Sequence, residues 1–193
     1  MSPNEPDRGP TNEPVSGSLL VAAPGLEDPN FRRAVILLCE HGDAGSFGLV
    51  LNRVLAVKPG DVFDSLEPVP HPMAYGGPVQ SDTMHFIHRL GDRVPDGVDL
   101  ADGLSWGGDF ERLQAVIEAN PGLAGRARFF LGYSGWTPGQ LDAEVAEGSW
   151  IAVAARSADV FGPSPEELWR KTMRRMGGPN ALWANAPDDP RTN

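Results

Sequence analysis

The sequence predicts an α+β fold built on a largely antiparallel sheet. Strand patterns fill the first half of the chain, two of them joined by so few residues that we expect an antiparallel hairpin, and the clearest helix patterns come later. The glycine-rich phosphate-binding motifs of nucleotide folds are absent from the sequence. These observations favour α+β over a regular alternation of strands and helices.

The expected strands begin near the N-terminus. A strand over residues 18–23 is followed by one helical turn over 28–31. The continuous apolar run at 34–39 predicts a central strand that is buried on both faces. Residues 47–52 are its expected hairpin partner, across the glycine-bearing turn 42–45. The other elements expected here are a short helix at 60–66 and strands at 73–75, 84–88, 103–106, 128–131 and 150–154.

Two helices carry clear start and stop signals. Asp109 is the expected N-cap of a helix over 110–119, whose apolar residues recur on one face, and Pro121 ends it. A capping box at 164–167 opens a later helix, which the glycines at 177–178 end. We therefore expect each helix to pack one apolar face on the sheet.

The stretch 129–141 is predicted to contain a strand, a tight glycine corner and a capped helix. Gly132 and Gly135 permit backbone angles that other residues avoid, so they mark the corner. Thr137 and Gln140 have the spacing of a capping box. The segment therefore predicts a rigid joint between a strand and a helix.

The same corner is similar to the G-x-S-x-G elbow that carries serine nucleophiles. Trp136 replaces the last glycine of that motif, and no histidine follows Ser134 in the chain order of that class. The pattern therefore favours a structural corner and leaves a serine-type hydrolase using Ser134 as an alternative.

Composition restricts the class of protein. The 193 residues include 26 Asp and Glu against 16 Lys and Arg, a formal net charge of −10, which disfavours nucleic acid as a partner. The single Cys39 excludes an internal disulfide, and no metal or cofactor is expected. No signal-peptide pattern and no apolar run of about 20 residues is present, so we expect a cytoplasmic protein without a membrane segment.

The tails differ from the middle of the chain in composition. Proline and polar residues dominate residues 1–16 and 184–193, and we expect both segments to be disordered. No linker divides the sequence between them, so a single domain is expected over 17–183.

Four motifs carry a family resemblance. They are Gly17-Ser18-Leu19-Leu20-Val21-Ala22, Gly48-Leu49-Val50-Leu51-Asn52-Arg53, Tyr75-Gly76-Gly77-Pro78-Val79 and Gly132-Tyr133-Ser134-Gly135-Trp136. Together they resemble the YqgE/AlgH family of bacterial proteins over residues 17–178. The resemblance implies a compact α+β domain whose sheet curls into an irregular partial barrel with helices packed on it. It implies no established enzymatic activity; one branch has been described as a transcriptional regulator of alginate production.

Polar and aromatic residues of these motifs lie at expected strand ends. The candidate ligand-binding residues are Asn52, Arg53, Gly76, Gly77, Tyr133, Trp136 and Gln140. Arg53 could clamp a carboxylate or phosphate, and the glycine pair could present backbone N–H groups to an anion. The structural alternatives are that Asn52 satisfies loop backbone groups, Arg53 pairs with a surface acid and the glycines form a plain turn.

The aromatic and histidine candidates also have two interpretations. Tyr133 and Trp136 could form the floor of a pocket, or could be core residues with a tethered polar atom. His85 and His88 are three residues apart on an expected strand, where they face opposite sides and make a poor metal pair.

The sequence therefore predicts a cytosolic, non-catalytic binding or interaction protein, with a regulatory role as one form of that function. Its partner is an unknown protein or small ligand. The alternatives are the hydrolase above and a transcription-associated regulator. The second alternative requires a contiguous basic face from Arg126, Arg170, Lys171, Arg174 and Arg175.

Overall fold

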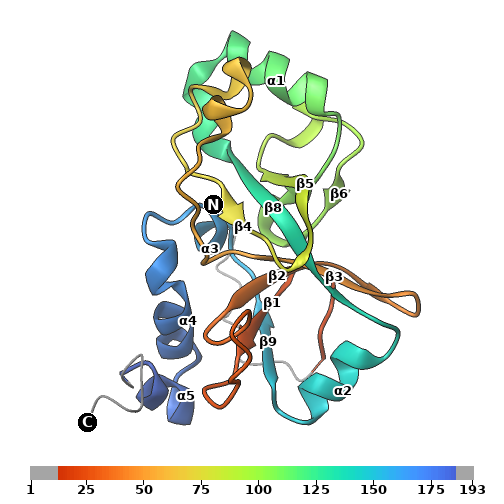
Figure 1. Cartoon of the computed structure of the whole chain (residues 1–193), viewed down its shortest axis with the longest axis vertical. Coiled ribbons are helices and arrows are strands. Elements are labelled where there is room, and N and C mark those ends of the chain that lie inside the picture. The colour runs from red at the N-terminus through yellow and green to blue at the C-terminus, as the bar shows by residue number, and fades with distance from the viewer. Residues whose placement is uncertain (1–12, 186–193) are drawn as a thin grey trace, which may run out of the picture.

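A nine-stranded sheet forms the centre of the molecule (Figure 1). The computed structural model describes residues 13–185; of the expected disordered tails, residues 1–12 and 186–193 lie outside this range. The strands are β1 Ser18–Ala22, β2 Val35–Gly42, β3 Gly45–Val50, β4 Ala74–Tyr75, β5 Val79–His88, β6 Val98–Asp99, β7 Ser105–Trp106, β8 Ala127–Trp136 and β9 Trp150–Ala154. Their order is β6-β7-β5-β8-β3-β2-β1-β9, with β4 beside β8. All pairs are antiparallel except β4 and β8.

The sheet is open. Its path has β6 at one end and β9 at the other, and these two strands do not pair. The α+β class with a largely antiparallel sheet is therefore confirmed, whereas the partial barrel implied by the family resemblance is not. The reason is that a barrel needs its edge strands to meet, and β6 is a two-residue strand that pairs with β7 alone.

Helices cover the sheet in three places. The α-helices are α1 Phe110–Ala119, α2 Gln140–Ala146, α3 Ser157–Phe161, α4 Leu168–Met176 and α5 Gly178–Trp183. The 3-10 helices are η1 Pro59–Asp61, η2 Asp64–Leu66, η3 Gly91–Arg93, η4 Ala101–Gly103, η5 Pro121–Arg126 and η6 Pro165–Glu167. In Figure 1, α1 lies at the top, α4 and α5 at the left and α2 at the lower right. None of the helices in the described part of the chain is both long and apolar enough to span a membrane.

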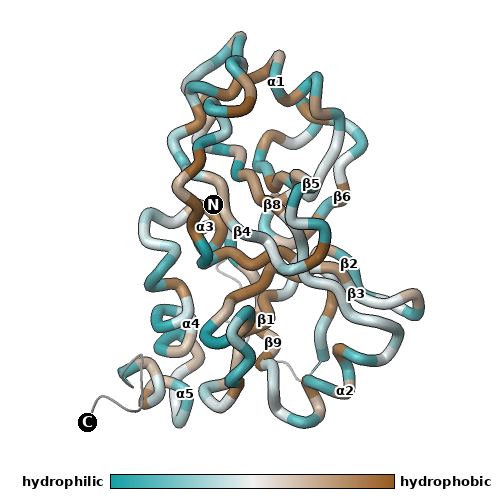
Figure 2. Tube along the Cα trace, in the orientation of Figure 1, coloured by the Kyte–Doolittle hydropathy of each residue, from teal (hydrophilic) through white to brown (hydrophobic). Residues whose placement is uncertain are grey.

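The central strand prediction is confirmed by β2. Its residues 35–39 are fully buried, and they alternate between two apolar clusters. Leu37 packs in the cluster that contains Trp169 of α4, whereas Ile36 packs in the cluster that contains Leu141 of α2. A strand covered on both faces has no polar side, which explains the continuous apolar run. Figure 2 shows the hydrophobic residues concentrated along these central strands.

Strand β8 joins the two halves of the sheet. Its first half pairs with β5 and β4, and its last three residues pair with β3. The expected glycine corner at 132–135 is therefore wrong, because the strand continues through it to Trp136. Gly132 has φ of 68°, and a Cβ there would lie 2.4 Å from the Gly77 carbonyl oxygen. The glycine thus serves a close backbone approach inside a strand instead of a turn.

Several helix ends also differ from the prediction. Helix α2 begins at Gln140, after Gly139 with φ of 72°, which is later than expected. The Thr137 N–H nevertheless donates to the Gln140 side chain at 3.0 Å, which is one of the two hydrogen bonds of the expected capping box. Ser164 makes no side-chain capping bond at η6, so the second expected capping box is wrong. By contrast, Asp109 accepts a hydrogen bond from the Arg112 N–H at 2.9 Å, which confirms the cap of α1.

Candidate functional site

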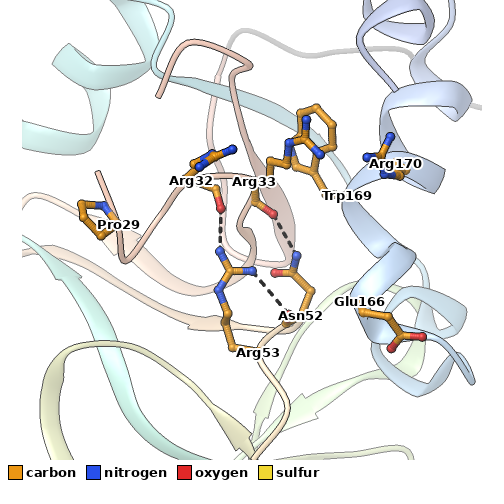
Figure 3. Close-up of a pocket in the computed structure, with 8 residues that line it drawn as sticks. All are labelled: Pro29, Arg32, Arg33, Asn52, Arg53, Glu166, Trp169 and Arg170. Carbon is orange, nitrogen blue, oxygen red and sulfur yellow. Dashed lines mark hydrogen bonds between the residues drawn. The ribbon is translucent and has the colours of Figure 1, made fainter. Parts of the chain in front are cut away.

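A pocket of about 330 Å³ opens where the hairpin β2–β3 meets α4 (Figure 3). Three separate segments line it: the loop before β2, the residues directly after β3, and the η6–α4 segment. The lining residues are Pro29, Arg32, Arg33, Asn52, Arg53, Glu166, Trp169 and Arg170. Two of the seven predicted site residues, Asn52 and Arg53, are among them. We refer to it as the Arg53 pocket.

Asn52 has a structural role in the wall of this pocket. Its side-chain oxygen accepts from the Val35 N–H at 2.9 Å, and its side-chain nitrogen donates to the Arg33 carbonyl at 2.8 Å. The residue is 7% exposed. Both ends of the amide are thus used to tie the end of β3 to the start of β2, which is the structural interpretation of this residue.

Arg53 crosses the pocket toward the loop before β2. Its guanidinium donates to the Arg32 carbonyl at 2.5 Å and to the Asn52 carbonyl at 3.5 Å (Figure 3). The expected pairing with a surface acid is absent among the described residues. Burial lowers the pKa of Arg53 from its ordinary value, because an apolar environment disfavours the charged form. Backbone carbonyls therefore hold the guanidinium in place, and it forms no ion pair with a carboxylate of residues 13–185.

The opposite wall comes from η6 and α4. The Arg33 guanidinium lies 4.9 Å from the centre of the Trp169 ring, a cation–π arrangement that Figure 3 shows. Trp169 is buried, and its indole N–H donates to the Ala22 carbonyl at 2.8 Å. Arg170 donates to the Ala184 carbonyl. Glu166 is the one carboxylate among the described residues that line the pocket.

Gly76 and Gly77 lie at a backbone crossing instead of in the pocket. The Gly76 N–H donates to the Leu131 carbonyl at 2.7 Å, so it is not available to an anion. A Cβ on Gly77 would lie 2.2 Å from the Tyr133 carbonyl carbon, and one on Gly76 would lie 2.2 Å from the Gly132 oxygen. The glycine pair thus lets β4 and β8 approach closely.

Tyr133 packs in a group of rings from four strands. The Phe47 ring is stacked on it at a centroid distance of 4.6 Å, and the His85 ring lies 5.8 Å away. The Trp106 ring belongs to the same group, with its centroid 4.6 Å from that of Phe47. Phe47, Trp106 and Tyr133 are partly buried against the apolar cluster that contains Trp169, and none of the four rings lines the Arg53 pocket.

Trp136 and Gln140 meet around a third residue, Glu144 of α2. One Glu144 oxygen accepts from the indole N–H groups of Trp136 at 2.9 Å and Trp150 at 2.8 Å, and the other accepts from the Gln140 side chain at 2.8 Å. Three donors around one carboxylate fix α2 against β8 and β9. Trp136 is 7% exposed, so it is a core residue with a tethered polar atom.

Ser134 has none of the surroundings of a nucleophile. The side chain is fully buried, and its hydroxyl donates to the Gly76 carbonyl at 3.2 Å. No histidine is hydrogen-bonded to it in residues 13–185, where His88 instead contacts Gly107 and Leu90. A hydrolytic serine needs both a base and access to substrate, so this geometry gives no support to the hydrolase alternative.

The basic residues expected for a nucleic-acid face are separated. Arg175 pairs with Asp159 at 2.9 Å. Arg126 ends η5, which packs on α1, whereas the other four basic residues belong to α4. Figure 1 shows α1 and α4 in different parts of the molecule. This arrangement does not favour the regulator alternative as a DNA-binding protein.

The structure therefore divides the predicted site into four places, one of which is the group of rings around Tyr133. Asn52 and Arg53 share the Arg53 pocket, the glycine pair lies at the crossing with β8, and Trp136 and Gln140 surround Glu144. Sequence reasoning missed Arg32 and Glu166, which line the pocket. The turn at 28–31 ends beside Arg32, and a basic residue directly after such a turn was the available signal.

The comparisons with known proteins agree with one another. A family model described as AlgH-like matches residues 19–181. A UPF0301 protein of Chlorobaculum tepidum is 42% identical over 177 residues, which cover 92% of this chain and 95% of that protein. A UPF0301 protein of Cytophaga hutchinsonii is 40% identical over 181 residues, 93% of this chain and 99% of that protein.

Two solved structures are similar in fold. Protein DIP2367 of Corynebacterium diphtheriae has a TM-score of 0.78 and 31% identity, over 90% of this chain and 93% of that chain. The solution structure of the AlgH protein of Pseudomonas aeruginosa has a TM-score of 0.69 and 28% identity, over 98% of this chain and the whole of that chain. The names of these proteins assign no reaction and no ligand.

Proposed function

The chain belongs to the AlgH-like family, and we propose that it is a non-catalytic binding protein whose Arg53 pocket holds an anionic group of a small ligand or partner protein. The observation that carries the proposal is the pair Arg32 and Arg53, two guanidinium groups in one pocket that form no ion pair with a carboxylate of residues 13–185. Binding of this kind is also how the expected regulatory role would be exerted.

The position of Arg53 favours recognition of an anion. Backbone carbonyls hold its guanidinium in one place, so little side-chain entropy is lost when a ligand binds. A guanidinium offers five N–H donors in a planar fork, of which the two hydrogen bonds at Arg53 use two. The remaining donors, and the exposed Arg32 beside them, match a phosphate or carboxylate.

A titration tests the proposal directly. We would record amide and indole resonances of the isotope-labelled full chain while adding sodium phosphate or sodium citrate at constant ionic strength, with sodium chloride as the reference. Saturable shifts are expected for Arg32, Arg53 and the Trp169 indole. Arg53→Ala is expected to weaken binding at least about tenfold, because it removes the fixed donor fork.

Arg93→Ala is the matched control, since Arg93 is exposed on η3 and does not line this pocket. Equal binding by wild type and Arg53→Ala, or shifts spread evenly over the surface arginines, would contradict the proposal. A pull-down from lysate with the same two variants extends the test to a partner protein, which we expect phosphate to displace.

A further inference from the structure

A second cavity of about 220 Å³ lies beside Arg128 and, like the Arg53 pocket, is lined by Glu166 of η6. Its lining residues are Val54, His71, Pro72, Arg128, Gly162, Pro163, Pro165 and Glu166. It shares only Glu166 with the Arg53 pocket, so the two cavities can be altered separately. We refer to it as the Arg128 cavity.

Arg128 is a buried cation that has no paired carboxylate in the described part of the chain. It is 4% exposed, and its guanidinium donates to the Val160 carbonyl at 2.6 Å and the Leu51 carbonyl at 2.7 Å. No carboxylate of residues 13–185 pairs with it. Burial lowers the pKa of Arg128 to about 10, which still leaves the group charged at neutral pH. A buried charge of this kind is costly until an opposite charge compensates it.

The guanidinium still has donors for a ligand. Two of its five N–H groups are used by the carbonyls of Val160 and Leu51, and three remain. The Phe130 ring centre lies 5.5 Å from the guanidinium carbon and covers one of its faces. Since the cavity borders the same side chain, the remaining donors are the natural partners of an anion placed there.

The walls of the cavity select the kind of anion. Val54, Pro72 and Pro163 provide an apolar lining around a single cation. His71 adds no second charge at neutral pH, because burial and the neighbouring Arg128 lower its pKa. Glu166 at the shared border opposes a further negative charge. One positive charge, apolar walls and a small volume suit a monoanion with a short hydrocarbon chain.

We infer that the Arg128 cavity is a binding site for a small aliphatic monocarboxylate, whose carboxylate pairs with the buried Arg128 guanidinium while its hydrocarbon chain contacts the valine and proline walls. This inference is independent of the proposed function, because the Arg53 pocket can be empty while this cavity is filled.

Sodium propionate titrated into the full chain tests the inference, with binding followed by calorimetry and by the resonances of Val54, His71 and Val160. Saturable binding with shifts at these residues is expected. Val54→Glu places a negative charge at the cavity and is expected to weaken binding about tenfold or more. Val54 is 45% exposed, so this variant is expected to fold normally.

The controls separate this cavity from the other pocket. Val62→Glu adds the same charge at a residue that is 58% exposed and lines neither cavity, and it is expected to leave propionate binding unchanged. Arg53→Ala is also expected to leave it unchanged, whereas Arg128→Lys is expected to weaken it by removing the planar fork. The inference is overturned if propionate does not saturate, if Val54→Glu binds as wild type does, or if Arg53→Ala abolishes the binding.

Discussion

Arg53 and Arg128 make the same kind of contact in opposite environments. Each guanidinium donates to two backbone carbonyls, and neither forms an ion pair with a carboxylate of the described residues. Arg53 is half-buried at the edge of an open pocket, whereas Arg128 is 4% exposed beside a small cavity. Leu51 and Val160, whose carbonyls accept from Arg128, are fully buried, so water cannot take the place of the guanidinium as their donor.

The difference teaches that burial decides what an arginine contributes. At an exposed position, solvent can take over the hydrogen bonds, so the guanidinium is available for recognition at little cost to the fold. At a buried position, the same bonds are part of the fold, and the charge also creates a demand for an anion. Four predictions use this contrast.

The largest expected effect is on stability. Arg128→Met should lower the free energy of unfolding by about 2–4 kcal/mol, because it leaves the Val160 and Leu51 carbonyls buried without donors. Arg53→Met should lower it by only about 0.5–1.5 kcal/mol. Urea denaturation of both variants measures the two values, and equal losses would remove the distinction between the two arginines.

Asn52, in the wall of the Arg53 pocket, should contribute more to the stability of the fold than Arg53 does. Asn52→Ala leaves the Val35 N–H and the Arg33 carbonyl without their partner, at an expected cost of about 1–3 kcal/mol. The Val35 amide should then exchange with solvent faster than in wild type, which hydrogen exchange can follow. Asn30→Ala, at an exposed position in the same loop, is the control and should change stability by less than about 0.5 kcal/mol.

The affinities of the two proposed binding sites should depend differently on salt concentration. Raising sodium chloride from about 0.05 to 0.5 M should weaken phosphate binding at the Arg53 pocket several-fold, because exposed charges are screened over a few ångströms. Propionate binding at the Arg128 cavity should change much less, because dissolved salt screens a buried charge pair much less than an exposed one. Parallel titrations at the two salt concentrations measure both trends, and an equal loss at both sites would contradict the contrast.

The smallest expected effect is a dependence of stability on pH. Burial lowers the pKa values of His71, His85 and His88, and Arg128 lowers that of His71 further. The folded protein then binds fewer protons than the unfolded chain below pH of about 6.5, so stability should fall as the pH drops through that value. Melting temperatures between pH 8 and 5 measure the slope.

His71 links this slope to the Arg128 cavity. His71→Gln should reduce the loss of stability at acidic pH by the share of one histidine. In Arg128→Met the pKa of His71, followed by its ring resonances, should rise toward its ordinary value. A His71 pKa that does not move in that variant would show that Arg128 does not contribute to its shift.

Local patterns predicted much of the fold. The Asp109 cap, the apolar run of β2 and the hairpin with β3 depend on neighbours within a few residues, and all three are confirmed. The predicted glycine corner was wrong because Gly132 is required by a contact with a distant segment. It leaves room for the backbone of Gly77, 55 positions earlier in the chain. A sequence pattern shows that a glycine is needed, but not whether a turn or a close approach requires it.

The candidate site was predicted in part for the same reason. Asn52 and Arg53 come directly after an apolar run, so the sequence pattern predicted their position at the end of a strand. Arg128 opens another predicted strand, yet its partners Val160 and Leu51 are 32 and 77 residues away in sequence. Nothing in the residues around Arg128 indicates that those two carbonyls will enclose it.

The sequence by itself determined the family, the α+β class, the central strand and the capped helix α1, since each follows from motifs, periodicity or short-range hydrogen bonds. Only the tertiary structure decided that Trp136 is tethered to Glu144, that Ser134 is buried, and which arginine is open to solvent. Burial is set by segments that meet in space, and the energy of a charged or polar group depends on that burial more than on its neighbours in the chain.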